Sequence, residues 1–280
     1  MKRLGYYNGK YGPLEEMTVP MNDRVCWFGD GVYDAGPCRN YKIFALDEHV
    51  DRFFRNAAWL GVEMPLTKEE FKDLLNKLVH EMDSGDLFVY MQLTRAASVP
   101  RQHPYTEGPG SLWVTLNPAK IPDGKVPIKL ITREDTRFFH CNIKTLNLLP
   151  SVLASQRAAE AGADECVFIR DGFVTECAHS NVHILKDGAF ITHPADCLIL
   201  PGIARAHLIR FCRKNGVKVI EKPFTYGELL DADEVIVSSS GSFCLQAREI
   251  DKKEVGGKAP ELLRTIQDAM VRDFIEKTSV

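Results

Sequence analysis

The stretch "FFHCNIKTLNLLPSVLASQRAAEAG", residues 138–162, places one lysine in an apolar run that leads into a helical pattern. The neighbours of Lys144 are aromatic or aliphatic: Phe138, Phe139, Ile143, Leu146, Leu148 and Leu149. Such a lysine either extends its ammonium group to water or loses its charge and becomes an amine nucleophile. A helix is predicted over residues 147–161, so Lys144 is expected at a strand-to-helix junction, where functional groups are often held rigidly. A solvated lysine and a catalytic amine both remain open on this pattern.

Length and composition predict an ordinary globular protein. The chain has 280 residues, of which 45% are hydrophobic and 26% are charged, and its formal net charge is -3. This balance supplies no basic surface for nucleic acid or for an acidic membrane. No apolar run approaches the roughly 18 residues of a membrane span, and the N-terminal residues lack the apolar segment of a signal peptide. We expect a cytoplasmic protein without a nucleic-acid or membrane partner.

The eight cysteines form no C-x-x-C pair and have no nearby histidine at zinc-ligand spacing. A disulfide framework is not expected in a chain of this length without a secretory signal. We therefore expect thiols that are buried or have no chemical role, and no metal centre.

The first 117 residues contain both strand and helix patterns. The pair Asn8-Gly9 lies between two apolar runs, which predicts a type I′ hairpin. A second strand pair is expected over residues 31–46, followed by an amphipathic helix that Asp47 caps and Gly61 ends. Thr67 begins a capping box for a second helix. Residues 87–95 and 111–117 are predicted to be strands.

The stretch "NPAKIPDGKVP", residues 117–127, is rich in proline and glycine and has no periodicity. We therefore expect an N-terminal domain over residues 1–117, a linker over residues 118–127 and a larger C-terminal domain over residues 128–280. The C-terminal part contains two predicted hairpins, at residues 171–172 and 187–188, among further strands and three helices. This loose alternation predicts an α/β or α+β fold with mixed sheets, and not a doubly wound parallel sheet.

Three further features could contribute chemistry. Glu176 lies in a strand-like run, where its carboxylate could face water, or face inward and pair with a cation. Gly202 and Ile203 begin a helix, whose free N–H groups can bind an anion. The run "SSSGS", residues 238–242, could form a second anion-binding turn. Each feature is weak alone, but together with Lys144 they match what a pyridoxal phosphate enzyme needs: a Schiff-base lysine, an acid for the pyridine nitrogen and donors for a phosphate.

Five motifs resemble the fold-type IV pyridoxal phosphate aminotransferases, in this order: "FGDGVYD", "LDEHVDRFFRNA", "NIKTLNLLPSVLA", "VTECAHSNV" and "LPGIAR". The resemblance runs from about residue 8 to beyond residue 237. It implies a two-domain enzyme with a smaller N-terminal domain, a larger C-terminal domain and the cofactor between them.

The resemblance also implies roles for individual residues. Lys144 matches the lysine that binds the cofactor as a Schiff base, and Glu176 matches the acid that keeps the pyridine nitrogen protonated. Phosphate contacts are implied for Arg52, Ile203, Ala204 and Ser240, and Leu200 matches the side chain packed on the ring. The helical pattern alone places Arg52 on the polar side of its helix, with Asp51 and Arg55. An exposed arginine with no role in phosphate binding is therefore the alternative.

The substrate is suggested by "PRQH", in which Arg101 and His103 stand two residues apart. The pair resembles the Arg-x-His carboxylate trap of bacterial D-amino acid aminotransferases. In those enzymes the trap reaches into the neighbouring subunit's active site, beside a tyrosine that corresponds to Tyr33. The resemblance thus implies a homodimer that transfers the amino group of D-alanine to 2-oxoglutarate. Three features depart from the family pattern: Asp34 replaces a glutamate, Ala204 replaces a threonine, and the stretch between Arg95 and Arg101 is one residue longer.

Alternatives remain within and outside this chemistry. The same cofactor and lysine serve 4-amino-4-deoxychorismate lyase and branched-chain L-amino acid aminotransferase. Outside enzymes, the alternatives are a pyridoxal phosphate carrier and a noncatalytic relative. The presence of Lys144, Glu176 and Arg52 in one chain argues against the noncatalytic relative, and the Arg101/His103 pair argues against the other two enzymes.

Overall fold

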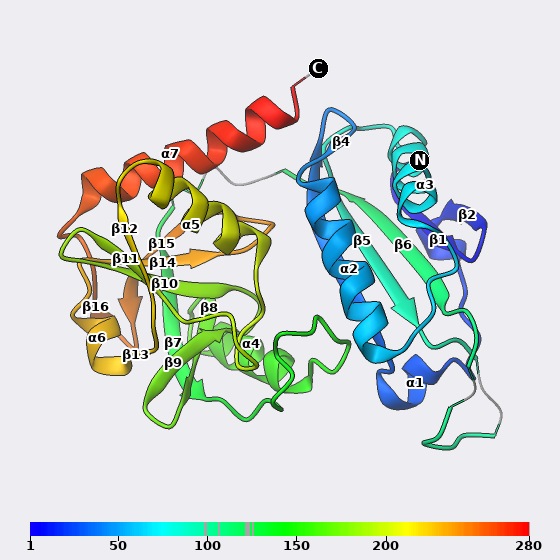
Figure 1. Cartoon of the computed structure of the whole chain (residues 1–280), viewed down its shortest axis with the longest axis horizontal. Helices are drawn as coiled ribbons and strands as arrows, with labels where there is room; N and C mark the ends of the chain where they lie inside the picture. Colours follow the sequence, from blue (N-terminus) through cyan, green and yellow to red (C-terminus); the bar gives the residue numbers. More distant parts are fainter. Residues whose placement is uncertain (98–99, 106, 121–123, 125, 280) are drawn as a thin grey trace. The chain divides into compact units, whose positions relative to one another are not determined.

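The computed structural model describes residues 1–97, 100–105, 107–120, 124 and 126–279. The chain divides into two compact units (Figure 1). The first comprises Met1–Ile121, Ile143–Asn147 and Ile275–Val280, and the second comprises Pro122–Asn142 and Leu148–Phe274. The expected linker, residues 118–127, includes positions outside the described residues, so the domain boundaries given above stay a prediction.

The first unit is built on a six-stranded sheet in which every neighbouring pair is antiparallel. Its order is β2-β1-β6-β5-β3-β4. The strands are β1 (Leu4–Tyr7), β2 (Lys10–Pro13), β3 (Gly31–Arg39), β4 (Lys42–Ile43), β5 (Leu87–Thr94) and β6 (Ser111–Pro118). The hairpin at Asn8-Gly9 is confirmed, since both residues have positive φ angles between β1 and β2.

Helices α2 (Leu46–Leu60) and α3 (Lys68–His80) share one hydrophobic core with this sheet. The capping box at Thr67 is confirmed, and Gly61 ends α2 with a φ of 68°. The prediction that Asp47 caps α2 is wrong. The cap is Ala45, which has no side-chain acceptor, and Asp47 lies in the first turn, where its charge complements the helix dipole.

Two short helical segments of this unit, η1 (Leu14–Glu16) and α1 (Arg24–Phe28), were not predicted. The signals for α1 are local: the Asp23 carboxylate accepts from the Val25 N–H at 2.9 Å, and Gly29 ends the helix with a φ of 61°. Five residues are too few to show a helical period, which explains why the pattern did not reveal it.

The second unit contains a larger mixed sheet, with strand order β12-β11-β10-β14-β15-β7-β8-β9-β13 and β16 paired to β15. The pairs β11/β12, β15/β7 and β7/β8 are parallel and the others are antiparallel. The strands are β7 (Ile128–Glu134), β8 (Glu165–Arg170), β9 (Phe173–Cys177), β10 (Asn181–Lys186), β11 (Ala189–Thr192), β12 (Lys218–Glu221), β13 (Phe224–Thr225), β14 (Glu234–Ser238), β15 (Leu245–Ile250) and β16 (Lys253–Glu254). The expected mixed α/β class is confirmed.

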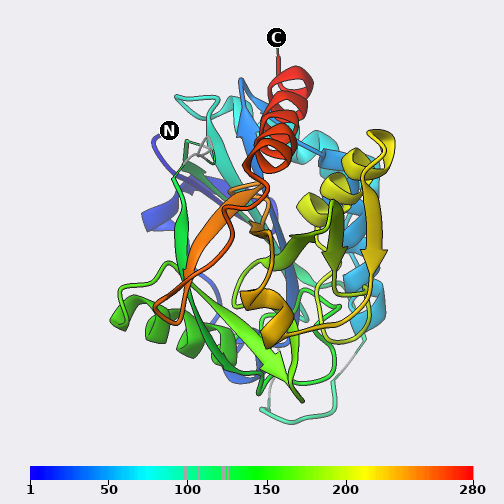
Figure 2. The same ribbon diagram turned by 90° about the vertical axis from the view of Figure 1, so that its left-hand side faces the viewer.

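Four helices belong to this part of the chain: α4 (Leu149–Glu160), α5 (Ile203–Lys214), α6 (Tyr226–Leu230) and α7 (Pro260–Lys277). Helix α4 packs on β7 and β8 through Ala154 and Ala158 (Figure 2). Both predicted Asp-Gly hairpins are present, as β8–β9 and β10–β11. The strands β13, β15 and β16 and the short α6 were missed by the sequence prediction. Among the described residues, no helix is both long and apolar enough to cross a membrane.

Candidate functional site

Lys144 belongs to the first unit, although the segments on either side of residues 143–147 belong to the second. The backbone around it extends the sheet along β3: Thr145 bridges to Val32, and the Tyr33 N–H donates to the Lys144 carbonyl at 2.9 Å. Lys144 therefore lies in a short extended segment that pairs with β3, a few residues before α4 begins at Leu149. Its position is set by backbone pairing, which leaves the side chain available.

The structure brings Lys144 and Tyr33 together. The Lys144 Nζ lies 4.3 Å from the centroid of the Tyr33 ring. That ring in turn stacks on Tyr90 at a centroid distance of 5.4 Å, and the Tyr90 hydroxyl donates to Gln92 Oε1 at 2.6 Å. A lysine ammonium over the face of an aromatic ring is attracted by the electrons of that ring. Tyr33, which is itself stacked on Tyr90, is thus the aromatic neighbour of the Lys144 amine.

Arg52 is buried, with 4% of its surface exposed, so the reading of an exposed arginine on the polar side of its helix is wrong. Its Nε and Nη2 donate to the Asp34 carboxylate at 2.7 and 2.8 Å, and His49 Nδ1 lies 2.7 Å from the same group. Burial alone would raise the pKa of Asp34. The charges and hydrogen bonds of Arg52 and His49 outweigh burial and hold that pKa well below its usual value.

Arg101 and His103 are both exposed and gather around one aromatic ring. The Arg101 guanidinium lies 4.6 Å from the centroid of Phe28, and the His103 ring lies 5.2 Å from it. Phe28 is the last residue of α1, so this unpredicted helix supports the predicted carboxylate-binding pair. The stretch between Arg95 and Arg101 includes residues outside those described.

In the second unit, Glu176 lies in β9 and is buried, which decides between the two orientations left open by the sequence. Its Oε1 accepts a charged hydrogen bond from Arg137 Nη1. Its Oε2 accepts from the Asn181 amide at 2.9 Å and from the Leu200 N–H at 3.0 Å. A buried carboxylate with these donors is held in its ionised form.

Sequence reasoning missed Arg137, which is the cation that makes this burial possible. Its Nε and Nη2 donate to the two oxygens of Asp135 at 2.9 and 2.8 Å. Burial opposes the charge of Arg137, but hydrogen bonds to Asp135 and attraction by Glu176 outweigh it and raise the pKa of Arg137. The same pairing lowers the pKa of Asp135 despite its burial. The sequence did contain a signal for Arg137: in "DTRFFHC", residues 135–141, this arginine stands next to two phenylalanines. Lys144 was singled out for the same reason, a charged side chain among apolar ones.

Asn181 was also missed, although it lies inside one of the recognised motifs. Its amide donates to Glu176 and, at 3.0 Å, to the Leu200 carbonyl, and its backbone pairs with Ser238 at the end of β14. A Cβ placed on Gly202 would lie 2.2 Å from Asn181 Oδ1, so only glycine allows this approach. Asn181 therefore connects the Glu176 carboxylate to the segment that begins α5.

The predicted anion-binding residues occupy the two turns that lie next to Asn181. Ile203 and Ala204 are the first residues of α5, and Gly202 supplies no side-chain acceptor for the N–H groups of that first turn. Ser240 lies in the turn that follows β14, where Ser239 Oγ and Ser242 Oγ are 2.8 Å apart. The start of a 12-residue helix with no capping side chain suits an anionic group.

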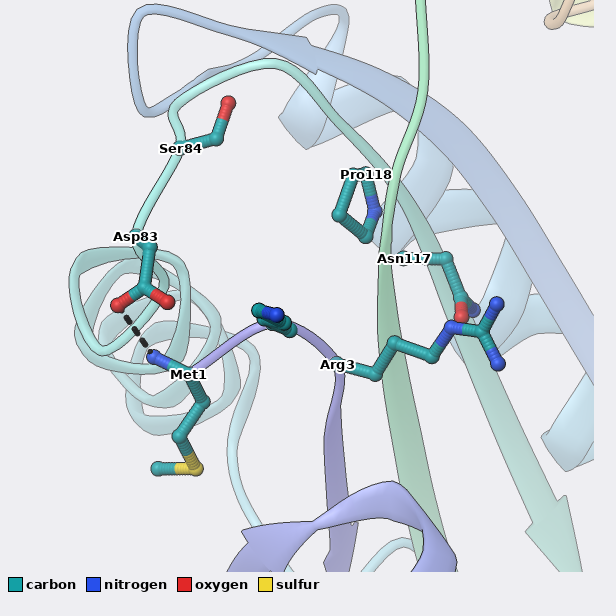
Figure 3. A pocket seen from close by; sticks show the side chains of 7 residues that line it. Met1, Arg3, Asp83, Ser84, Asn117 and Pro118 are labelled. Atoms are coloured by element: carbon teal, nitrogen blue, oxygen red, sulfur yellow. Dashed lines mark hydrogen bonds and ion pairs between the residues drawn. The ribbon is translucent and has the colours of Figure 1, made fainter.

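A cavity of about 340 Å³ opens beside the N-terminus, and none of the predicted site residues lines it (Figure 3). Its wall includes the N-terminal ammonium, which contacts Asp83 at 2.8 Å. Within the described part of the chain, no three His, Cys, Asp or Glu side chains are placed to hold a metal ion.

Comparison with known proteins shows the family of this chain. The model of the family "Amino-transferase class IV" matches residues 31–250. The D-alanine aminotransferase of Bacillus licheniformis is 37% identical over 278 residues, which is 98% of each chain. That of Listeria monocytogenes serotype 1/2a (strain 10403S) is 41% identical and spans 93% of this chain and 92% of its own.

Solved structures support the same fold. The branched-chain amino acid aminotransferase of Escherichia coli superposes with a TM-score of 0.89 at 21% identity, over all of this chain and 96% of its own. The branched-chain aminotransferase of the thermophilic archaeon Thermoproteus uzoniensis, solved with norvaline, gives 0.88 at 24% identity, over 99% and 96%. Another branched-chain amino acid aminotransferase, complexed with N-(5'-phosphopyridoxyl)-L-glutamate, also gives 0.88 at 24% identity, over 98% and 94%. The chain therefore belongs to the class IV aminotransferase family.

Proposed function

We propose that this protein is a pyridoxal phosphate-dependent D-alanine aminotransferase, which converts D-alanine and 2-oxoglutarate to pyruvate and D-glutamate. The observation that carries the proposal is the match to D-alanine aminotransferases at 37–41% identity over more than nine-tenths of both chains. The site residues fit this activity, because they supply an amine, an ionised buried acid and a pair of groups suited to a carboxylate.

The residues of this chain fit pyridoxal phosphate. Glu176 is a buried carboxylate that Arg137 keeps ionised, which is what a protonated pyridine nitrogen requires. The N–H groups at Ile203 and Ala204 suit the phosphate. Ser240, in the turn after β14, is the further phosphate contact that the family resemblance implies. When bound, the cofactor supplies an electron sink for the carbon that loses its proton.

The roles of the remaining residues follow from their chemistry. Lys144 Nζ would hold the cofactor covalently, and its free amine would remove the Cα proton of the bound amino acid. Leu200 would pack on the cofactor ring, and its N–H helps to orient Glu176. Arg52 stays a predicted phosphate contact, with its Nε and Nη2 already bonded to Asp34.

Substrate recognition is assigned to Tyr33, Arg101 and His103. A guanidinium group matches the planar fork of a carboxylate, and the pair stands two residues apart beside Phe28. We further propose a homodimer in which Arg101 and His103 reach the active site of the neighbouring subunit. The cytoplasm is the compartment that we propose from the sequence.

The test of the function uses purified protein saturated with pyridoxal phosphate and follows the visible absorbance of the bound cofactor. D-alanine without an acceptor should change the spectrum, L-alanine should not, and 2-oxoglutarate should restore it. A response to L-leucine but not to D-alanine would favour the branched-chain aminotransferase instead. Pyruvate release from 4-amino-4-deoxychorismate would favour the lyase, and failure to bind the cofactor would favour a noncatalytic relative.

Replacing Glu176 with Gln should lower kcat by about 10²–10³-fold, because a neutral amide cannot stabilise a positive charge on the ring nitrogen. The KM for D-alanine should change little. The control is Glu160→Gln on the exposed surface of α4, where the carboxylate contacts Arg157 and Gln156. Steady-state kinetics with D-alanine measure both variants, and an unchanged kcat for Glu176→Gln would contradict its role.

Replacing Arg101 with Met should raise the KM for D-alanine and for 2-oxoglutarate by about tenfold, with kcat nearly unchanged. The reason is that a carboxylate contact made equally in the ground state and the transition state contributes to binding alone. Arg55→Met, at an exposed arginine of α2, is the control. A fall in kcat without a rise in KM would mean that Arg101 does not bind the substrate carboxylate.

A further inference from the structure

The segment that holds Arg101 and His103 is bonded through its backbone to one buried arginine. Arg24 donates from Nη1 to the Gln102 carbonyl at 2.7 Å and from Nη2 to the His103 carbonyl at 3.0 Å. The two acceptors are consecutive, and one of them belongs to a residue of the predicted carboxylate-binding pair. A guanidinium group has a rigid planar fork, so two such bonds fix the direction of the peptide as well as its distance.

Arg24 is itself held firmly. Only 4% of its surface is exposed, and its Nε donates to Asp30 Oδ2 at 2.7 Å. The backbone N–H of Arg24 donates to the Ala96 carbonyl at 3.1 Å, which ties the start of α1 to the end of β5. Its three guanidinium nitrogens thus each have an oxygen partner within 3.0 Å. Because these bonds fix the Arg24 guanidinium, it can in turn fix the two carbonyl groups that it binds.

The carboxylate that orients Arg24 is anchored in turn. Asp30 also accepts from Arg95 Nε at 3.0 Å, and Arg95 donates to the carbonyls of Leu60 and Gly61 at the end of α2. Arg24 therefore links the rigid sheet and helix of the first unit to residues 102 and 103. The Arg24 guanidinium also lies 4.8 Å from the centroid of the Phe28 ring, and the Arg101 guanidinium lies 4.6 Å from the same centroid.

We propose that Arg24 is a positioning residue for substrate recognition: it holds the peptide of Gln102 and His103 so that Arg101 and His103 present their side chains to the substrate carboxylate. This inference rests on the proposed function of Arg101. Arg24 does not touch the substrate and acts through the two carbonyls that it binds. Because exposed polar side chains are held loosely, fixing their backbone is what limits their freedom.

The experiment is a double-mutant cycle on the full-length enzyme loaded with cofactor, with Arg24→Met, Arg101→Met and the double variant. Arg24→Met alone should raise the KM for D-alanine and for 2-oxoglutarate about tenfold and leave kcat within about twofold. In the Arg101→Met background, Arg24→Met should have a clearly smaller effect, because only His103 is then left for it to position. The affinity for pyridoxal phosphate, titrated by fluorescence, should not change.

Each other outcome has a definite meaning. If Arg101→Met leaves KM unchanged, the proposed role of Arg101 fails and the inference fails with it. If Arg101→Met raises KM but Arg24→Met does not, the inference alone is overturned. Equal effects of Arg24→Met in both backgrounds would also overturn it, since the arginine would then act independently of Arg101. A purely structural role would lower the melting temperature and the active fraction but not change KM.

If Arg24→Met does not fold, Arg24→Lys replaces it in the same cycle. Lysine keeps the positive charge beside Asp30, but one ammonium group cannot reproduce the flat fork that reaches both carbonyls. The KM should then rise about threefold, and by less in the Arg101→Met background. An Arg24→Lys enzyme with wild-type KM values would overturn the proposal.

Discussion

Replacing Lys144 with Ala should lower kcat for D-alanine by about 10⁴-fold or more, while the protein stays folded. The chain would lose both the covalent attachment of its cofactor and the base that removes the Cα proton, and general acid–base catalysis alone contributes up to about 10⁴-fold. The fold should tolerate the change, because Lys144 is held by its backbone: its carbonyl accepts from Tyr33 and the next residue bridges to β3.

Three comparisons make this result specific. Lys144→Arg keeps a positive charge but cannot act as the amine nucleophile, so it should be as inactive as the alanine variant. Lys129→Ala removes an exposed lysine that contacts Glu249 and should retain activity. Borohydride reduction of the loaded wild-type enzyme, followed by mass spectrometry, should find the cofactor on the peptide that contains Lys144. Turnover of Lys144→Ala within tenfold of wild type would rule out the assigned role.

The second large effect concerns stability. Replacing Asp34 with Asn should destabilise the protein by about 3–5 kcal/mol, as expected when one partner of a buried ion pair is removed. Asp34 is fully buried and its carboxylate receives Arg52 and His49 from α2. The midpoint of urea denaturation measures the change. Asp51→Asn is the control on α2, the helix that carries Arg52 and His49, because its exposed pair with Lys68 should contribute less than about 1 kcal/mol.

The effect of Asp34→Asn should depend on pH in a defined direction. The folded protein holds the pKa of Asp34 below its unfolded value, so folding favours the ionised form. The stability that this carboxylate contributes is fully present above about pH 4, the ordinary range of an aspartate, and is lost as the pH falls below it. The gap in stability between wild type and Asp34→Asn should therefore shrink below about pH 4. A gap that is constant from about pH 7 to about pH 3 would contradict the ion-pair explanation.

Local signals in the sequence predicted much of the secondary structure. The hairpin at Asn8-Gly9 and the capping box at Thr67 depend only on neighbouring residues, and both are present. The wrong prediction that Asp47 caps α2 also came from a local signal. An aspartate near a helix start can cap it or lie in the first turn, and only the path of the incoming chain decides between them.

The sequence by itself also determined the family, because the motifs around Lys144 and Glu176 are contiguous and their order is visible in the chain. It did not determine which charges pair. Arg137 and Glu176 are 39 positions apart, and Arg24 contacts carbonyls 78 and 79 positions away. Such partners are chosen when strands and helices pack, since a buried charge must find whichever opposite charge or carbonyl the fold brings near. The tertiary structure therefore decided how the site residues are oriented, by placing Arg137, Asn181 and Arg24 beside them.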